Sequence, residues 1–250
     1  MTNEQEKRVV IITGLVAMMF GGRASERQAP HLESAPVATV VGDLTSPEVV
    51  QKIVDEARAK FGQIDALVNN AGIYRIGEVA TTELDVFDEI VDTNLRAVIR
   101  LSRAALPDLI KTRGSIVNIS SIAGVAAVGE PEISQFTRTQ FPGATYYCMS
   151  KGALDQFSRC LALEQAVNGV RVNSVNPGVI KTDIFRRAGL DEKGVEEVCP
   201  MDLTHPLGRV GDVGDTAQAI AWLADSTKSG FVTGETLRVD GGKAINIDNT

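Results

Sequence analysis

Short apolar runs rich in β-branched residues recur along the chain, and the longer stretches between them carry apolar residues at helical spacing. The runs occupy residues 9–13, 37–42, 64–69, 115–120, 170–175 and 236–239. Strands that are apolar along their whole length are typical of a parallel sheet covered on both faces. The alternation of these runs with helical segments therefore predicts an α/β fold with a doubly wound parallel sheet.

Two helices are predicted with particular clarity. The first spans residues 47–61, where Ser46 can cap the N-terminus and Gly62 follows the last turn. The second covers residues 82–110, and its apolar stripe contains one polar member, Asn94. A buried amide must be hydrogen-bonded, so Asn94 is either a structural anchor between strands or part of a site. The spacing alone favours the anchor.

Length and composition restrict the class of protein. The 250 residues can bury a sizeable core without an internal linker, so residues 1–250 are expected to form a single domain. A net charge of −7 offers no basic surface for nucleic acid. The polar N-terminus and the absence of a long apolar stretch predict a cytoplasmic protein without a membrane partner. The three cysteines lack metal-site spacing, and no metal is expected.

Tyr147 and Lys151 lie four residues apart at the start of a predicted helix, which places a phenol and an ammonium on one helical face. A cation close to a phenol lowers the pKa of the phenol, as proton exchange with an alcohol or ketone near neutral pH requires. The same spacing also arises by chance on exposed helix faces, so the pair carries weight only with its context.

That context is a series of short motifs. They are TG at 13–14, GDLT at 42–45, NNAG at 69–72, NISS at 118–121, YCMSK at 147–151, NPGVIKT at 176–182 and VDGG at 239–242. In this order they resemble the short-chain dehydrogenase/reductase family, above all its 3-oxoacyl carrier-protein reductase-like members. The resemblance is nearly continuous from about residue 37 to 243. It implies a Rossmann-like fold and hydride transfer between a nicotinamide cofactor and a carbonyl or secondary alcohol.

The resemblance implies roles for four catalytic residues. Tyr147 would be the general acid/base, and Lys151 would lower its pKa and hold the nicotinamide ribose. Ser121 would hydrogen-bond the substrate carbonyl, and Asn94 would hold a water that links Lys151 to solvent. A hydride that arrives at a carbonyl carbon leaves charge on the oxygen, so donors must already point there.

The implied cofactor-binding residues follow strand ends, where open α/β sheets bind ligands. Asp43 would contact the adenine, residues 70–72 would line the adenosine, and residues 177–182 would cover the nicotinamide. The full set is Gly14, Arg23, Asp43, Leu44, Asn70, Ala71, Gly72, Tyr147, Lys151, Pro177, Gly178, Ile180 and Thr182.

The N-terminal stretch departs from the family pattern. Relatives place a TGxxxGxG loop after the first strand, where its glycines let the backbone reach the pyrophosphate. Here Gly14 is followed by no glycine until Gly21, as though the loop and the first crossover helix were missing and the N-terminal βαβ unit were truncated.

Two topologies are open for this stretch, because adjacent parallel strands need a crossover of a dozen or more residues. In the preferred one, residues 9–13 remain the central strand, and residues 15–35 form an irregular crossover to 37–42 in a smaller sheet. In the other, residues 15–21 keep the second strand position and 9–13 are displaced. Arg23 would then stand where the family reads the adenosine ribose, and a guanidinium there suits a 2′-phosphate. NADP(H) is therefore expected over NAD(H), although Arg23 also fits a solvated charge at a helix start.

A second departure is an apparent insertion at residues 126–140, long enough to be a functional or disordered loop beside the substrate cleft. Ser134 lies within it near the usual serine spacing before the tyrosine, but the strand-end context favours Ser121.

Three functions remain under consideration. An NADP(H)-linked carbonyl reductase or alcohol dehydrogenase accounts for all four catalytic residues. A non-catalytic or cofactor-impaired member, such as a splice form or a decayed copy, accounts for the missing loop. A generic Rossmann-like binding module leaves the serine, tyrosine and lysine unexplained. The resemblance also implies a homotetramer, in which helices 82–110 and 147–167 pack against their copies.

Overall fold

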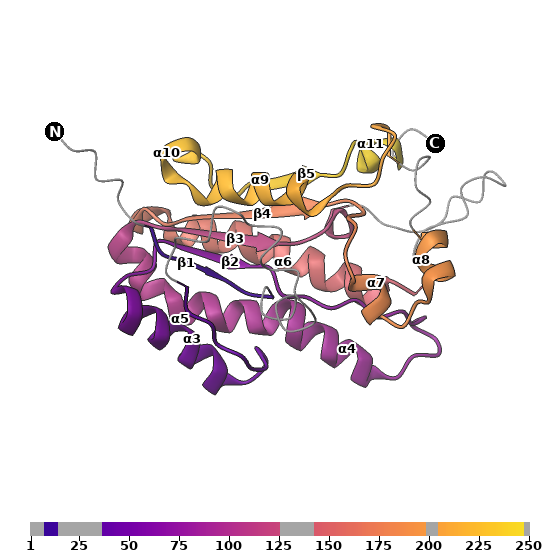
Figure 1. The fold of residues 1–250 in the computed structure, drawn as a ribbon, viewed down its shortest axis with the longest axis horizontal. Helices are drawn as coiled ribbons and strands as arrows, with labels where there is room; N and C mark the ends of the chain where they lie inside the picture. Colours follow the sequence, from indigo (N-terminus) through magenta and orange to yellow (C-terminus); the bar gives the residue numbers. More distant parts are fainter. Residues whose placement is uncertain (1–7, 15–36, 126–142, 199–204, 248–250) are drawn as a thin grey trace.

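One parallel sheet forms the centre of the molecule (Figure 1). The computed structural model describes residues 8–14, 37–125, 143–198 and 205–247. Within these ranges the strand order is β1-β2-β3-β4-β5, and every neighbouring pair is parallel. The strands are β1 (Val10–Ile12), β2 (Ala66–Asn69), β3 (Ser115–Ile119), β4 (Arg171–Pro177) and β5 (Thr236–Val239). The predicted doubly wound α/β fold is confirmed. The single domain over the full chain stays a prediction.

Helices cover both faces of this sheet (Figure 1). The longer ones are α3 (Pro47–Phe61), α4 (Leu84–Val91), α5 (Ala97–Thr112), α6 (Thr145–Gln165) and α9 (Val213–Ala224). The shorter ones are η1 (Asp92–Arg96), η2 (Ile122–Gly124), η3 (Ala166–Asn168), α7 (Ile184–Arg187), α8 (Glu192–Val198), α10 (Ser226–Ser229) and α11 (Lys243–Ile247).

The core divides into layers because alternate strand residues point to opposite faces. Leu67, Ile116 and Val172 pack with residues of α3, α5 and α6 on one face. Val68 and Val117 pack with residues of α9 on the other. The apolar strands predicted from the sequence are buried on both sides for this reason.

Both predicted helices are confirmed. In α3 the Ser46 hydroxyl accepts from the amide of Val49, and Gly62 ends the helix at φ +82°, a value that favours glycine. The helix predicted at 82–110 begins at Leu84 and runs without a break through α4, η1 and α5 to Thr112. Its middle segment, η1, is a π-helix that contains Asn94.

The predicted strand at residues 37–42 is wrong. The segment has no strand pairing in the described structure, and Val37 and Val41 are 53% and 60% exposed. Lys60 Nζ donates to the Val37 carbonyl, so the segment is tied to α3. The preferred central position for residues 9–13 is also wrong within the described ranges, because β1 pairs there with β2 alone and forms the sheet edge. An apolar run forms a strand only if another strand lies beside it. The residues between these two segments, including Arg23, lie outside the described part.

The inserted residues 126–140, with Ser134, also lie outside the described residues. Within those that are described, no helix is long and apolar enough to cross a membrane.

Candidate active site

Tyr147 and Lys151 lie near the start of α6 with their side chains together, as the four-residue spacing predicts. Lys151 is 4% exposed, and its Nζ lies 5.6 Å from the centroid of the Tyr147 ring. The same ammonium donates to the carbonyl of Ile119, the last residue of β3, at 2.8 Å. The end of β3 therefore fixes the ammonium beside the phenol.

Ser121 reaches the same point from the turn after β3. Its hydroxyl oxygen accepts from the amide of Ala123 at 3.1 Å and so caps η2. The side chains of Ser121 and Tyr147 are hydrogen-bonded to each other. Two hydroxyl groups and one ammonium thus converge at the carboxyl end of β3, the edge at which open α/β sheets bind ligands.

The electrostatics of the pair differ from the expectation. Burial raises the pKa of Tyr147 to about 12, and the hydrogen bond with Ser121 opposes this rise without cancelling it. Burial lowers the pKa of Lys151 to about 8, while Asp155 acts in the opposite direction. Burial of the phenolate therefore outweighs the hydrogen bond with Ser121, and the role of Lys151 in lowering the phenol pKa stays a prediction.

Asn94 anchors a loop. Its side chain accepts from the amide of Ile73 at 2.8 Å, donates to the carbonyl of Ile73 at 2.9 Å, and donates to Ser150 of α6 at 3.1 Å. The residue is completely buried within the π-helical segment. Such segments are rare in proteins, and those that occur are often found at functional sites. Asn94 thus holds a loop against α6 and does not join two strands, so the predicted anchor between strands is not what the structure shows. The water-holding role stays a prediction.

Gly72 lies between the side chains of Asn94 and Lys151. A Cβ atom on Gly72 would lie 3.3 Å from Asn94 Oδ1 and 3.5 Å from Lys151 Nζ. These two side chains therefore flank one stretch of bare backbone, and a Cβ atom there would press on Asn94 and touch Lys151.

The backbone segments that follow β1 and β2 also lie close together. Thr13 Oγ1 accepts from the amides of Asn70 and Ala71 at 3.0 and 3.1 Å. Gly14 has φ +81°, and a Cβ atom on it would lie 2.8 Å from Asn70 Nδ2. This close approach requires glycine at position 14.

The remaining candidate residues are less closely joined to the catalytic group. Gly178 donates its amide to the Val239 carbonyl at 3.0 Å, Ile180 bridges to Gly211, and Pro177 and Thr182 are partly buried. Asp43 accepts from the amide of Thr45 at 2.8 Å, and Leu44 follows it before α3. Among the described residues, no hydrogen bond joins Asp43 or Leu44 to the candidate catalytic side chains.

Sequence reasoning missed two aromatic residues at the site. The Tyr74 ring centroid lies 5.1 Å from that of Tyr147 and 5.6 Å from that of Phe185 on α7, both edge to face. Tyr74 lies two positions after the NNAG motif. An aromatic residue so close to a predicted cofactor loop could have indicated that it belongs to the site.

It also missed Asp155 and Asn176. Asp155 stands four residues after Lys151 on the same helical face, which could have drawn attention to it. Asn176 immediately precedes the Pro177 that was assigned to the cofactor site.

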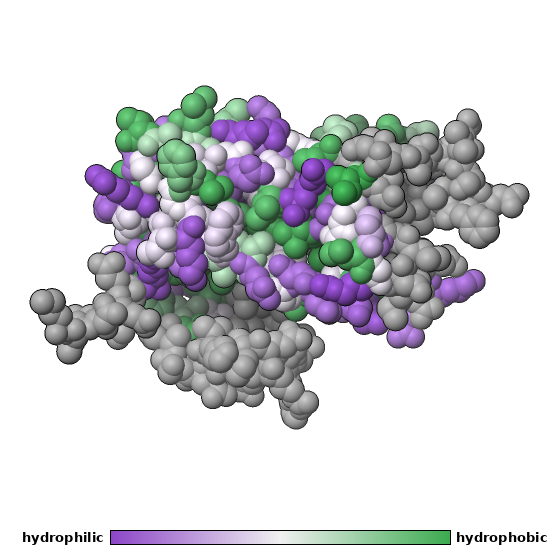
Figure 2. Space-filling model, turned by 90° about the horizontal axis from the view of Figure 1, so that it is seen from above, coloured by the Kyte–Doolittle hydropathy of each residue, from purple (hydrophilic) through white to green (hydrophobic). Residues whose placement is uncertain are grey.

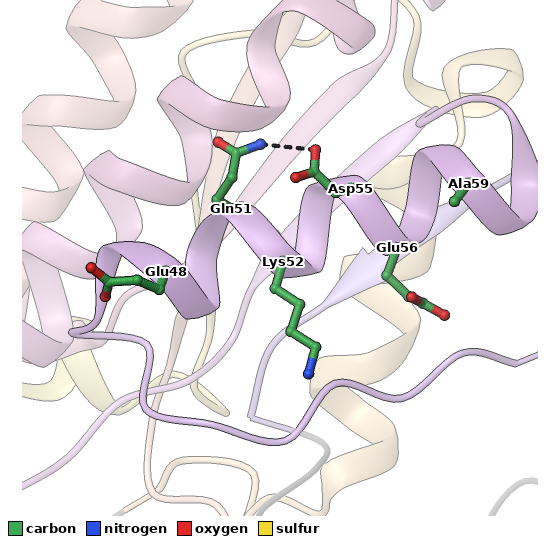
Figure 3. Close-up of a pocket in the computed structure, with 6 residues that line it drawn as sticks. All are labelled: Glu48, Gln51, Lys52, Asp55, Glu56 and Ala59. Carbon is green, nitrogen blue, oxygen red and sulfur yellow. Dashed lines mark hydrogen bonds between the residues drawn. The ribbon is translucent and has the colours of Figure 1, made fainter.

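An exposed hollow on the outer side of α3 is not part of this site (Figure 3). Its lining residues are Glu48, Gln51, Lys52, Asp55, Glu56 and Ala59. In Figure 3 Gln51 points toward Asp55, to which it donates at 2.9 Å. No candidate catalytic residue lines it. The described ranges also contain no cluster of three or more His, Cys, Asp or Glu side chains that could hold a metal ion.

Known proteins are similar to this chain in both sequence and fold. Residues 10–244 match the family model described as enoyl-(acyl carrier protein) reductase. The chain is 36% identical over 232 residues to the 3-oxoacyl-[acyl-carrier-protein] reductase FabG of Escherichia coli (strain K12). That match covers 90% of this chain and 86% of the relative.

Two solved structures are similar over nearly the whole chain. A short-chain dehydrogenase/reductase of unknown function from Caenorhabditis elegans, with cofactor, has a TM-score of 0.76 and 30% identity and covers 95% of both chains. ElxO with NADP bound has a TM-score of 0.73 and 29% identity, over 95% of this chain and 98% of that chain. The chain therefore belongs to the short-chain dehydrogenase/reductase family and is an NAD(P)-dependent oxidoreductase.

Proposed function

We propose that the protein reduces a carbonyl substrate to a secondary alcohol with NADP(H), and that Tyr147 is the proton donor. The observation that carries this proposal is the convergence of Ser121, Tyr147 and Lys151 at the end of β3. The similarity to the E. coli 3-oxoacyl-[acyl-carrier-protein] reductase supports the reaction, and the NADP bound to ElxO supports the cofactor.

The residues at this end of the sheet fit the nicotinamide half of such a cofactor. Lys151 carries three N–H donors, and one of them is used by the Ile119 carbonyl. The backbone at Gly72 is bare beside Lys151, so a ribose could approach it closely. Lys151 would hold the ribose hydroxyls, and residues 177–182 would cover the nicotinamide ring. The preference for NADP(H) over NAD(H) is part of the proposal.

The chemistry divides between cofactor and chain. When bound, the reduced nicotinamide supplies a hydride to the carbonyl carbon. The Tyr147 hydroxyl donates its proton to the carbonyl oxygen, and the Ser121 hydroxyl donates a hydrogen bond to the same oxygen. The pKa of about 12 keeps Tyr147 protonated at neutral pH, which is the form that reduction requires.

The substrate is proposed to carry an apolar group next to its carbonyl. Tyr74 and Phe185 place aromatic edges beside Tyr147, and Val179 belongs to the same apolar cluster. Such a wall favours an alkyl or aryl substituent over a charged one.

We also propose a cytoplasmic homotetramer. Hydrophobic residues are exposed among hydrophilic ones on the face that carries α9 and α10 (Figure 2). Phe231 and Trp222 are 104% and 39% exposed, and Leu163 and Val167 beside the end of α6 are 81% and 89% exposed. Exposed apolar residues of this size are typical of subunit interfaces. Light scattering on the eluted protein tests the state, and a monomer at micromolar concentration would refute it.

The deciding experiment is a fluorescence titration of the purified chain with NADPH and with NADH, accompanied by a thermal-shift measurement. We expect binding of NADPH in preference to NADH, followed by NADPH oxidation with apolar ketones and 3-oxoacyl thioesters. A folded protein that binds neither cofactor would instead establish the cofactor-impaired alternative.

A further inference from the structure

We propose that Asp155 is a positioning residue of the active site, acting through Asn176 to hold Ser121 in place; this inference rests on the proposed function. Asp155 lies one helical turn after Lys151 on α6 and two turns after Tyr147. Residues at these spacings share one helical face, so the carboxyl group lies on the catalytic side of the helix.

One amide group joins the carboxyl group to the serine. Asn176 Nδ2 donates to Asp155 Oδ2 at 2.8 Å and to the backbone carbonyl of Ser121 at 2.7 Å. The two hydrogens of this amide are thereby both used. Asn176 belongs to β4, Ser121 follows β3, and Asp155 belongs to α6, so the link ties three elements together at the site.

The link is buried at a cost to stability. Asp155 is 1% exposed and Asn176 is completely buried. The Asp155 carboxyl group also interacts with the hydroxyl groups of Ser120 and Ser174, whereas Asn176 Oδ1 has no hydrogen-bond partner within the described part of the chain. An apolar pair in the same place would avoid this unpaired acceptor and the burial of an acid, so stability alone does not account for an acid and an amide here.

The turn that carries Ser121 is pressed against α6 at the level of Asp155. A Cβ atom on Gly124, in η2, would lie 2.6 Å from Asp155 Oδ2 and 2.8 Å from the carbonyl carbon of Lys151. Ser120 Oγ also donates to the Lys151 carbonyl at 3.1 Å. A change in the shape or hydrogen bonding of Asp155 is therefore transmitted directly to the serine turn.

The consequence concerns the orientation of the Ser121 hydroxyl. With its carbonyl held by Asn176, the Ser121 backbone keeps one orientation, and its hydroxyl stays hydrogen-bonded to Tyr147. Without the Asp155 carboxyl group, Asn176 loses one of its two acceptors and can turn away. The serine would then stabilise the reacting oxygen less well, while the cofactor-binding residues remain in place.

The kinetic test compares three variants on α6. Asp155→Ala removes the acceptor and should lower kcat by about ten- to a hundredfold, the effect expected when a catalytic group is misplaced by about an ångström. KM and the NADPH Kd should change far less. Asp155→Asn retains an acceptor of the same shape and should recover most of kcat. Ser158→Ala, the matched control, removes a buried hydroxyl one turn further along and should lower Tm but leave kcat unchanged.

A spectroscopic test requires neither turnover nor cofactor. The chain has three tyrosines, so fluorotyrosine-labelled protein gives three fluorine NMR resonances, and Tyr147→Phe assigns one of them. Asp155→Ala should shift the Tyr147 resonance, whereas Asp155→Asn and Ser158→Ala should leave it in place. If Asp155→Ala does not fold, Asn176→Ala breaks the same link at its centre and should produce the same shift.

The outcomes separate the two proposals. An unmoved Tyr147 resonance in folded Asp155→Ala or Asn176→Ala, or an unchanged kcat, would overturn the positioning role. A wild-type protein that reduces no carbonyl compound would overturn the proposed function, and the fluorine spectra would still decide whether Asp155 positions Ser121.

Discussion

The interior of the sheet and its β1 edge differ in how firmly they are built. At β3 and β4, buried hydrogen bonds join strand ends, the serine turn and α6. At β1 the strand is three residues long, and Val10 and Ile12 are 44% and 43% exposed. The catalytic residues are therefore held by contacts among β3, β4 and α6, whereas the family's phosphate-binding loop would follow β1.

Under the proposed function, this difference separates proton chemistry from cofactor binding. The side chains proposed for proton transfer lie on α6 and in the turn after β3. The affinity for the pyrophosphate is expected to depend on the region after β1. Substitutions in each region should consequently change different measured quantities.

The largest expected effect is that of Tyr147→Phe. It removes the proton donor but no cofactor contact other than the hydroxyl, so turnover should fall by at least about a hundredfold. The NADPH Kd and Tm should stay close to those of the wild type, as measured by fluorescence titration and calorimetry. Tyr146→Phe is the control, since Tyr146 packs against Phe87 away from the ammonium. Substantial turnover in Tyr147→Phe would assign the proton to another group.

Lys151 should connect the two regions, so its loss should change both quantities. Lys151→Ala should reduce turnover and weaken NADPH binding by about tenfold or more, since a hydrogen bond from a charged group contributes about 1.5–3 kcal/mol. Unchanged NADPH affinity would place the lysine away from the ribose.

The pH profile should identify the same lysine. With a pKa of about 8, Lys151 loses its charge as pH rises through that value, and kcat/KM for reduction should fall there. Tyr147, with a pKa of about 12, is still protonated in this range and cannot cause the fall. Lys151→Ala should lack the fall near pH 8. A wild-type profile that stays flat to pH 9 would contradict the assignment.

Gly72→Ala should have an intermediate effect. The added Cβ would press on Asn94 and lie beside Lys151, so we expect a destabilisation of about 1–2 kcal/mol and weaker NADPH binding. Gly214→Ala is the matched control. Nothing lies within 4 Å of a Cβ at position 214 in helix α9, so this change should leave stability equal or slightly higher. Equal melting temperatures for the two variants would show that Gly72 is not crowded.

Ile12→Lys should have the smallest effect on activity and tests the other region. Ile12 is 43% exposed on the edge strand, so a charged side chain should cost about 0.5 kcal/mol or less in the free energy of unfolding. It should also suppress edge-to-edge association, which light scattering at rising concentration would detect. A large loss of stability would mean that another part of the chain covers β1, and the contrast between the regions would disappear.

Local signals made much of the fold predictable. Helix α3 was found from its cap residues and apolar stripe, which act within a few turns. The buried strands beside it were found because continuous apolar runs need no information about their partners. Residues 37–42 show the limit of that reasoning, since their β-branched residues favour an extended chain but a strand also requires a neighbour.

The site was predictable to the extent that it depends on sequence spacing. Tyr147 and Lys151 share a helix turn, and Ser121 closely follows a strand, so simple geometry brings them together. The raised pKa of Tyr147 was not predictable, because it follows from the packing of three elements around the phenol. The Asp155 and Asn176 contact joins residues 21 positions apart and depends on how α6 crosses β4.

The π-helical segment η1 makes the chain sensitive to single-residue deletions at one place. A π-turn accommodates one more residue than an α-turn, so removing one residue from 92–96 could convert the segment to regular α-helix. The helix would survive and α4 would keep its direction relative to α5, because the deletion removes only the additional residue that the π-turn holds. In a deletion scan, η1 should therefore yield folded protein in which Asn94 no longer reaches the loop at Ile73 or Ser150 of α6.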